Sequence, residues 1–140
     1  MSANPFVGTW TYRSLLNDPN LDQDFDKLEF GRGTIEIKEA APAVLAGTIG
    51  GPGWSLSLHG AFGFGSPMQV RFQGAGLIGG ERWVYDYIGW LVPVWPNSND
   101  TLQRAAIAGS IVRTIPHSGS EPGTVNPAGV VASFYAVRVG

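Results

Sequence analysis

The sequence predicts an all-β protein, an eight-stranded antiparallel up-and-down β-barrel, and three observations favour this fold class. First, 20 glycines and 10 prolines interrupt nearly every window in which a helical pattern could be sustained. Second, turn signals recur roughly every 8–12 residues, a spacing typical of sandwiches and barrels. Third, several segments alternate polar and apolar residues with a period of two. The 140 residues fit one domain, so we expect a single barrel over residues 1–140.

The first four expected strands are separated by clear turn signals. Residues 6–13 are mostly β-branched and aromatic, and residues 34–38 alternate with a period of two. Residues 44–49 follow an Ala-Ala-Pro-Ala turn. Residues 54–59 follow Gly-Gly-Pro-Gly and show the cleanest alternation in the chain. We therefore expect each of these strands to present one face to a core.

The last four expected strands are longer and more apolar. Residues 68–73 alternate in the same way, whereas residues 81–95 are rich in aromatic side chains on both faces. Residues 103–115 and 128–139 complete the set of eight. Strands of this kind suit a barrel whose outer wall is partly covered.

Glycines lie inside several of these strands. They are Gly8, Gly47, Gly89 and Gly109. A small barrel needs sharp coiling where side chains would crowd, so glycines at such positions favour a closed barrel.

In an antiparallel meander, alternate connections lie at the same end of the barrel. Residues 14–33, 50–53, 74–80 and 117–127 would therefore share one end. This set contains the two longest loops, and we expect it to surround the mouth of the barrel.

Composition excludes several classes of function. The chain has 9 Lys+Arg against 11 Asp+Glu and no basic run, so we expect no nucleic-acid partner. No window approaches the ~20 apolar residues that span a bilayer, and the first residues lack the pattern of a secretory leader. We expect a soluble, cytoplasmic protein with no membrane partner.

Metal and covalent chemistry are also poorly supported. Zero cysteines exclude a disulfide framework, a Cys-based zinc site and a thiol nucleophile. The acidic stretch 18–29 has spacing similar to a calcium-binding loop, but Gln23 stands where that loop needs glycine. No nucleophile elbow is present. We expect no metal and no cofactor.

Gly8-Thr9-Trp10 lies near the start of the chain and Arg138 near its end. The first resembles the lipocalin Gly-x-Trp motif and the start of avidins, and Arg138 stands where lipocalins place a basic residue across that tryptophan. The chain thus resembles the calycin superfamily, which includes lipocalins, fatty-acid-binding proteins and avidins. Tyr85-Asp86-Tyr87 is similar to a lipocalin motif but falls inside an expected strand. The polar biotin-binding residues of avidins are not matched. The resemblance implies an eight-stranded barrel in which Arg138 packs on Trp10.

The aromatic content predicts a ligand cavity in this barrel. Rings bury ligand area while hydroxyl and indole groups fix orientation, although the same rings could fill an ordinary core. We expect ligand contacts from aromatic residues together with a few polar side chains near the mouth. The candidates are Trp10, Trp54, Phe72, Tyr85, Asp86, Tyr87, Arg113, His117 and Phe134.

The sequence does not show which face of residues 81–95 points inward, because both faces are apolar. If Asp86 points inward it needs a partner, and Arg113 on the neighbouring strand is the candidate. Such a pair is either structural or part of a ligand or acid/base site. His117 lies in the mouth loop, where a polar group could touch a ligand.

The leading interpretation is a binding module that holds an apolar small molecule inside the barrel. The alternative is an isomerase or cyclase acting on an apolar substrate, and a third interpretation is a filled barrel with a structural role. Residues 81–95, 103–115 and 128–139, strands six to eight, do not alternate cleanly, so we also expect a homo-oligomer that covers their outer face. A fold-back of loop 117–127 over that face is the competing explanation.

Overall fold

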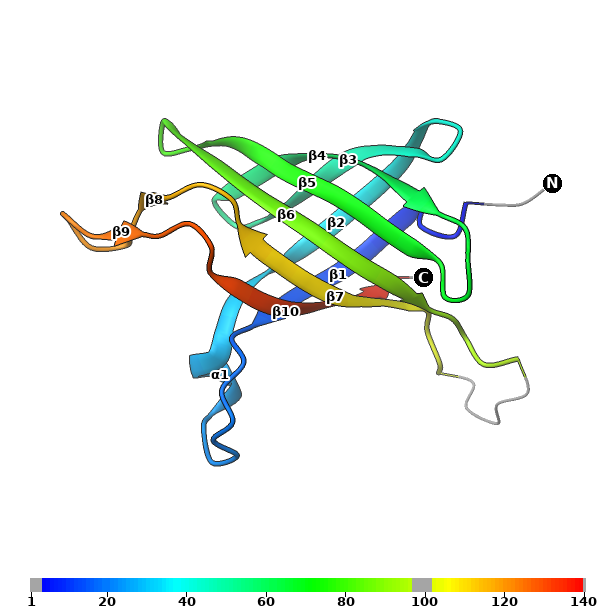
Figure 1. Cartoon of the computed structure of the whole chain (residues 1–140), viewed down its shortest axis with the longest axis horizontal. Helices are drawn as coiled ribbons and strands as arrows, with labels where there is room; N and C mark the ends of the chain where they lie inside the picture. The colour runs from blue at the N-terminus through cyan, green and yellow to red at the C-terminus, as the bar shows by residue number, and fades with distance from the viewer. Residues whose placement is uncertain (1–3, 97–101, 140) are drawn as a thin grey trace.

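The computed structural model describes residues 4–96 and 102–139, and in it eight strands close into a barrel (Figure 1). Every neighbouring pair is antiparallel, and the order around the barrel is β1-β10-β7-β6-β5-β4-β3-β2. This confirms the expected up-and-down barrel and is consistent with a calycin-like fold. The barrel strands are β1 (Gly8–Leu15), β2 (Glu29–Ala41), β3 (Val44–Gly51), β4 (Trp54–Gly63), β5 (Gln69–Ile78), β6 (Glu81–Val92), β7 (Ala106–Arg113) and β10 (Val131–Arg138).

Two small elements lie outside the barrel wall. The helix α1 (Phe25–Leu28) lies in the connection between β1 and β2. A two-stranded hairpin of β8 (His117–Ser118) and β9 (Val125–Asn126) interrupts the connection between β7 and β10. Figure 1 shows α1, this hairpin and the turn between β5 and β6 at one end of the barrel, as the meander requires. We call this end the mouth and the opposite end, where β1 begins and β10 ends, the closed end. Within the described residues, no helix has the length and apolar character needed to cross a bilayer.

Two expected loops at the mouth are shorter in the structure than in the sequence-based prediction. β2 begins at Glu29 rather than after Gly33, and β5 continues to Ile78 through the stretch 74–80 that was expected to turn. In β5 the glycine at position 74 makes room for a neighbouring side chain, because a Cβ atom there would lie 3.2 Å from the Ile49 side chain. The actual turn consists of Gly79 and Gly80, both with positive φ.

Interior glycines allow close approach between strands. A Cβ atom at Gly47 would lie 1.8 Å from the carbonyl oxygen of Glu36, and one at Gly109 would lie 1.9 Å from that of Ile88. No side chain fits at such a distance from fixed backbone. The tight coiling expected from glycines inside strands is thus confirmed at these two positions.

The barrel closes through β1 and β10, and this pairing brings Trp10 opposite Arg138. The guanidinium carbon of Arg138 lies 4.4 Å from the Trp10 ring centroid, and its Nη1 donates to the Val7 carbonyl at 2.9 Å. The Trp10 indole nitrogen donates to the Phe6 carbonyl at 3.0 Å. A cation–π contact of this kind contributes about 0.5–2 kcal/mol. The contact implied by the calycin resemblance is therefore confirmed.

The closed half of the barrel is filled by its own side chains. Trp10 and Phe6 are fully buried there, and aliphatic side chains from the surrounding strands complete the packing. The fully buried aliphatic residues include Ile35, Ile37, Leu45, Ile49, Leu58, Val70 and Ile107. The mouth half is lined by larger aromatic residues, some buried and some partly exposed, and the structure leaves space between them.

Candidate functional site

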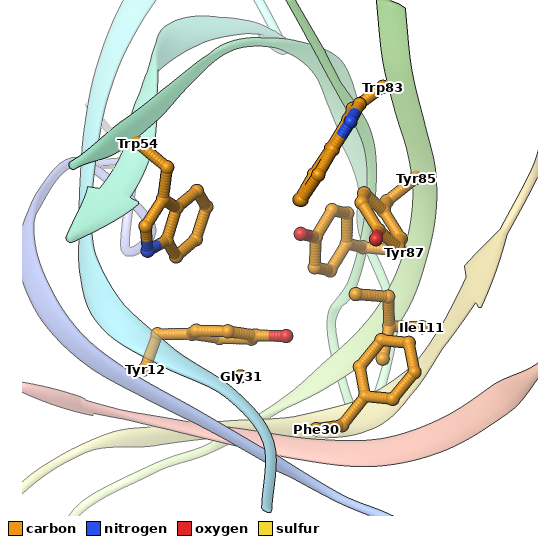
Figure 2. A pocket seen from close by; sticks show the side chains of 8 residues that line it. All are labelled: Tyr12, Phe30, Gly31, Trp54, Trp83, Tyr85, Tyr87 and Ile111. Carbon is orange, nitrogen blue, oxygen red and sulfur yellow. The ribbon is translucent and has the colours of Figure 1, made fainter. Parts of the chain in front are cut away.

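The mouth half of the barrel contains a cavity of about 190 Å³. Its walls come from five strands and are almost entirely aromatic. Figure 2 shows the lining side chains around a central space, with Trp54 of β4 and Trp83 of β6 on opposite sides. The complete lining is Tyr12, Phe30, Gly31, Trp54, Trp83, Tyr85, Tyr87 and Ile111. Because Phe30, Trp54 and Trp83 are only partly buried, the cavity reaches solvent at the mouth.

Two phenol hydroxyls point into this space from Tyr12 and Tyr87, as Figure 2 shows. Burial raises the pKa of Tyr12 to about 12, with a smaller opposing effect from hydrogen bonding to Ser14. Burial, followed by the neighbouring Tyr12, also raises the pKa of Tyr87 well above its usual value. Both phenols therefore stay protonated at neutral pH, and the cavity holds neutral hydroxyl donors rather than phenolates.

A hydrogen-bonded trio lies along one wall of the cavity. The Tyr85 hydroxyl lies 2.8 Å from His117 Nε2, and Arg113 Nε donates to the same hydroxyl oxygen at 3.4 Å. His117 Nδ1 lies 3.0 Å from the Ser118 carbonyl oxygen, which can only accept. In the neutral imidazole Nδ1 therefore carries the hydrogen, and Nε2 accepts from the Tyr85 hydroxyl.

His117 also fixes the position of a cavity wall. Its ring stacks on Trp83 with the centroids 3.7 Å apart and the planes 8° from parallel. Ser118, the next residue of β8, donates its backbone N–H to the Glu81 carboxylate at 2.8 Å. The β8–β9 hairpin is thus tied to the start of β6, and it orients two lining residues, Trp83 and Tyr85.

Arg113 is the one charged side chain that is buried among the described residues. Its guanidinium carbon lies 5.0 Å from the Phe30 ring centroid and 5.9 Å from that of Tyr85. Its Nη1 donates to the Pro127 carbonyl at 3.2 Å. In the part of the chain that the structure describes, the only ion pair within 4 Å joins exposed Arg32 to Glu29, so no carboxylate neutralises Arg113.

The structure resolves which face of β6 points inward. Trp83, Tyr85 and Tyr87 lie inside, and the intervening residues lie on the outer wall. Of the candidates from the sequence, Trp54, Tyr85 and Tyr87 line the cavity, and Arg113 and His117 lie directly behind the lining.

The other aromatic candidates lie deeper in the barrel. Phe72 stacks on Tyr87 with centroids 4.6 Å apart, and Phe134 meets the same ring edge-on. Trp10 is fully buried toward the closed end. Phe72 and Phe134 therefore pack against a lining residue, and none of the three side chains lines the cavity.

The pairing of Asp86 with Arg113 was expected only if Asp86 points inward, and the structure does not meet that condition. Asp86 lies on the outer wall, where its carboxylate accepts from Gln73 Nε2 at 2.9 Å and from the Thr114 hydroxyl at 2.8 Å. Strand register explains the difference, since Asp86 is paired with Val112 while Tyr85 is paired with Arg113. The two side chains therefore point to opposite sides of the wall.

Several lining residues were missed at the level of sequence. Tyr12 lies two residues after Trp10, so the period of two in β1 could have identified it. Trp83 lies on the same face as Tyr85 and Tyr87. It was not predicted because the sequence does not show which face of that strand points inward. Phe30 and Gly31 fell in an expected loop, and no signal in the sequence marks them as strand residues.

Comparisons of this chain with protein-family models, with curated proteins and with solved structures find no match.

Proposed function

We propose that the protein binds a small, largely apolar molecule in the mouth half of the barrel, with the ligand ring between Trp54 and Trp83. The observation that carries this proposal is an open, aromatic-lined cavity above a packed floor. Protein sites for small molecules combine mostly apolar walls with a few polar groups that fix orientation. The hydroxyls of Tyr12 and Tyr87 supply such groups here.

The volume limits the size of the ligand. A cavity of about 150 Å³ holds benzene, whereas pockets for drug-sized molecules are about 300–1,000 Å³. The 190 Å³ of this cavity therefore suits a single ring with one or two small substituents. A ligand with a long acyl chain or several fused rings would have to extend through the mouth into solvent.

The resemblance to calycins supports the same function. Lipocalins and avidins hold small molecules inside barrels of this kind, and this chain shares the motif Gly8-Thr9-Trp10 and the packing of Arg138 on Trp10. Fold alone does not assign a ligand, so the main support for binding is the cavity itself.

Tryptophan fluorescence tests the proposal directly. Titration with benzyl alcohol and toluene should change the emission of wild-type protein, and Trp54→Phe or Trp83→Phe should reduce that change. Trp90→Phe is the matched control, because Trp90 is on the outer wall. Native mass spectrometry of freshly purified protein should also show a co-purifying small molecule.

A cavity-filling variant gives a second test. A Cβ atom at Gly31 makes only ordinary contacts, 3.4 Å from Ser14 Oγ and 3.7 Å from the Tyr12 ring, so Gly31→Val should fold and project methyl groups into the cavity. We expect this variant to lose the fluorescence response, and thermal unfolding shows whether it folds. If wild-type protein responds to none of the compounds, or if Gly31→Val responds equally, the cavity is not a binding site.

The second candidate function is isomerisation of a bound apolar substrate, and the Tyr85 trio is the observation that favours it. A hydroxyl held between an imidazole nitrogen and a guanidinium can relay a proton to or from a molecule in the cavity. Proton NMR of a bound compound in heavy water should then show exchange of carbon-bound hydrogen, and Tyr85→Phe should abolish the exchange without loss of binding. An unchanged ligand spectrum would leave simple binding as the function.

A further inference from the structure

We infer that the ligand carries an acidic group, such as a carboxylate, that is recognised by Arg113 at the edge of the cavity. This inference rests on the proposed binding function and names the chemical class of the ligand. The starting point is that Arg113 is buried, with 8% of its surface exposed, and that no carboxylate of the described residues lies within 4 Å of it. Buried charges in proteins are normally paired, so this one lacks its usual partner.

The hydrogen bonds of Arg113 leave one side of the guanidinium available. Nε donates to Tyr85 and Nη1 to Pro127, whereas Nη2 has no acceptor in residues 4–96 and 102–139. Every fully enclosed side-chain nitrogen or oxygen in those residues has a partner. Nη2 is therefore not fully enclosed, and it is the atom at which we expect an anion to bind. Guanidinium groups bind carboxylates through two parallel N–H donors, a geometry that needs such an open side.

The guanidinium lies next to the proposed ligand. Phe30 and Tyr85, whose rings contact Arg113, are both lining residues of the cavity. An acidic substituent on a ring in the cavity would meet Arg113 beside these two residues. The hydroxyls of Tyr12 and Tyr87 also point into the cavity, and they can donate hydrogen bonds to the oxygen atoms of an acidic ligand.

The same features disfavour a cationic ligand. Aromatic walls can also attract quaternary ammonium ions, and an aromatic cavity alone would fit either charge. Here a permanent positive charge already lies against two of the walls, and it repels a second cation at short range. The positive charge of Arg113 therefore favours an anionic ligand over a cationic one.

The test compares three single-ring probes of similar size in wild-type protein by isothermal titration at neutral pH and constant salt. Benzoate should bind about tenfold more tightly than benzamide, its neutral isostere, a difference equivalent to about 1.4 kcal/mol. Phenyltrimethylammonium should bind more weakly than both. Equal or tighter binding of benzamide or of the ammonium probe would overturn the inference, whatever the variants show.

Variants then assign the preference to Arg113. Arg113→Met, whose apolar chain can pack against Phe30 and Tyr85, should lower the ratio of benzoate to benzamide affinity from about ten to about one. Arg113→Lys keeps the charge without the planar fork and should retain part of the preference. The matched control is Arg82→Met, since Arg82 is exposed on the outer wall of β6. A preference for benzoate that survives in folded Arg113→Met would refute the role of Arg113.

The two proposals fail in different ways. If none of the probes binds and the neutral compounds above give no fluorescence response, the cavity is not a ligand site and the proposed function fails. If neutral rings bind but charge makes no difference, binding stands and only the acidic class is refuted. Thermal unfolding of each variant shows whether the substituted chains are folded.

Discussion

At the scale of single residues, the polar groups of the cavity are two tyrosine hydroxyls. Burial raises the pKa of both. Tyr12 and Tyr87 lie with their rings at 6.0 Å and nearly perpendicular, and both hydroxyls face the space between Trp54 and Trp83. Because burial raises the pKa of each phenol, they serve as neutral donors. Arg113 is the only buried charged side chain in the described residues, and it contacts Phe30 and Tyr85.

The raised pKa of Tyr12 predicts a loss of stability at high pH. In the unfolded chain a tyrosine ionises near pH 10, whereas in the folded protein Tyr12 ionises near pH 12. Between these values only the unfolded state loses the proton, so the free energy of unfolding falls as pH rises from about 10 to about 12. The loss from this group is roughly 3 kcal/mol, since each unit of pKa corresponds to about 1.4 kcal/mol.

Urea unfolding between pH 9 and 11.5 checks this prediction. Tyr12→Phe should show a shallower fall of the free energy of unfolding than wild type over that range. Tyr135→Phe, which removes a phenol that is 41% exposed on the outer wall, is the control. Identical slopes for wild type and Tyr12→Phe would contradict the assignment.

Sequence reasoning at this scale succeeded where alternation is clean and failed where both faces of a strand are apolar. Trp54 heads a strand with polar residues at every second position, so its inward direction could be predicted. In β6 the two faces carry Trp83, Tyr85 and Tyr87 or Val84, Ile88 and Trp90, and hydrophobicity cannot choose between them. Only the register against β7 places Asp86 outside and Arg113 inside.

At the scale of elements, the glycines inside strands control how closely the strands approach. Gly109 of β7 faces β6 so closely that any side chain would collide with the Ile88 backbone. All eight barrel strands could be located from turn signals and alternation, but several ends could not. Gly31, Gly33, Gly74 and Gly76 suggest turns in a sequence, whereas in this barrel they are strand residues.

Substitution of Gly109 tests this structural role. Gly109→Ala should destabilise the protein by about 1–3 kcal/mol or more, because β6 and β7 must separate to admit a methyl group. Gly63→Ala at the end of β4 is the control, since a Cβ atom there has no heavy atom within 4 Å. Chemical unfolding followed by circular dichroism measures both variants, and equal stability of the two would show that the barrel tolerates the methyl group.

At the scale of the whole molecule, the outer wall carries an uncovered apolar row. Trp90 of β6, Ala108 of β7 and Tyr135 of β10 are paired across three adjacent strands, and Trp90 and Tyr135 are 39% and 41% exposed. The β8–β9 connection, which could have covered this face, instead contacts Glu81, Trp83, Tyr85 and Arg113 at the mouth.

We propose that this row forms part of a homo-oligomer contact, with a second copy of the chain as the partner. A symmetric dimer would bring the same patch of each subunit together and cover the exposed rings. Sedimentation equilibrium at micromolar concentration should show a species larger than the 14.9 kDa monomer. Trp90→Asp should dissociate it, whereas Arg82→Met should not, and a wild-type monomer would refute the proposal.

The interior has a packed closed half and an open mouth half, and this division affects which residues can be substituted during evolution. Substitutions of fully buried residues such as Trp10 or Ile37 leave voids and cost several kcal/mol, so drift at those positions is constrained. Phe30, Trp54 and Trp83 are partly exposed and hold less of the fold together, so they can vary at lower cost. Selection for a new ligand can therefore act on these three residues without much loss of stability, whereas the buried lining residues Tyr12, Tyr85, Tyr87 and Ile111 serve both the cavity and the core. The specificity of this barrel can be redesigned from its mouth.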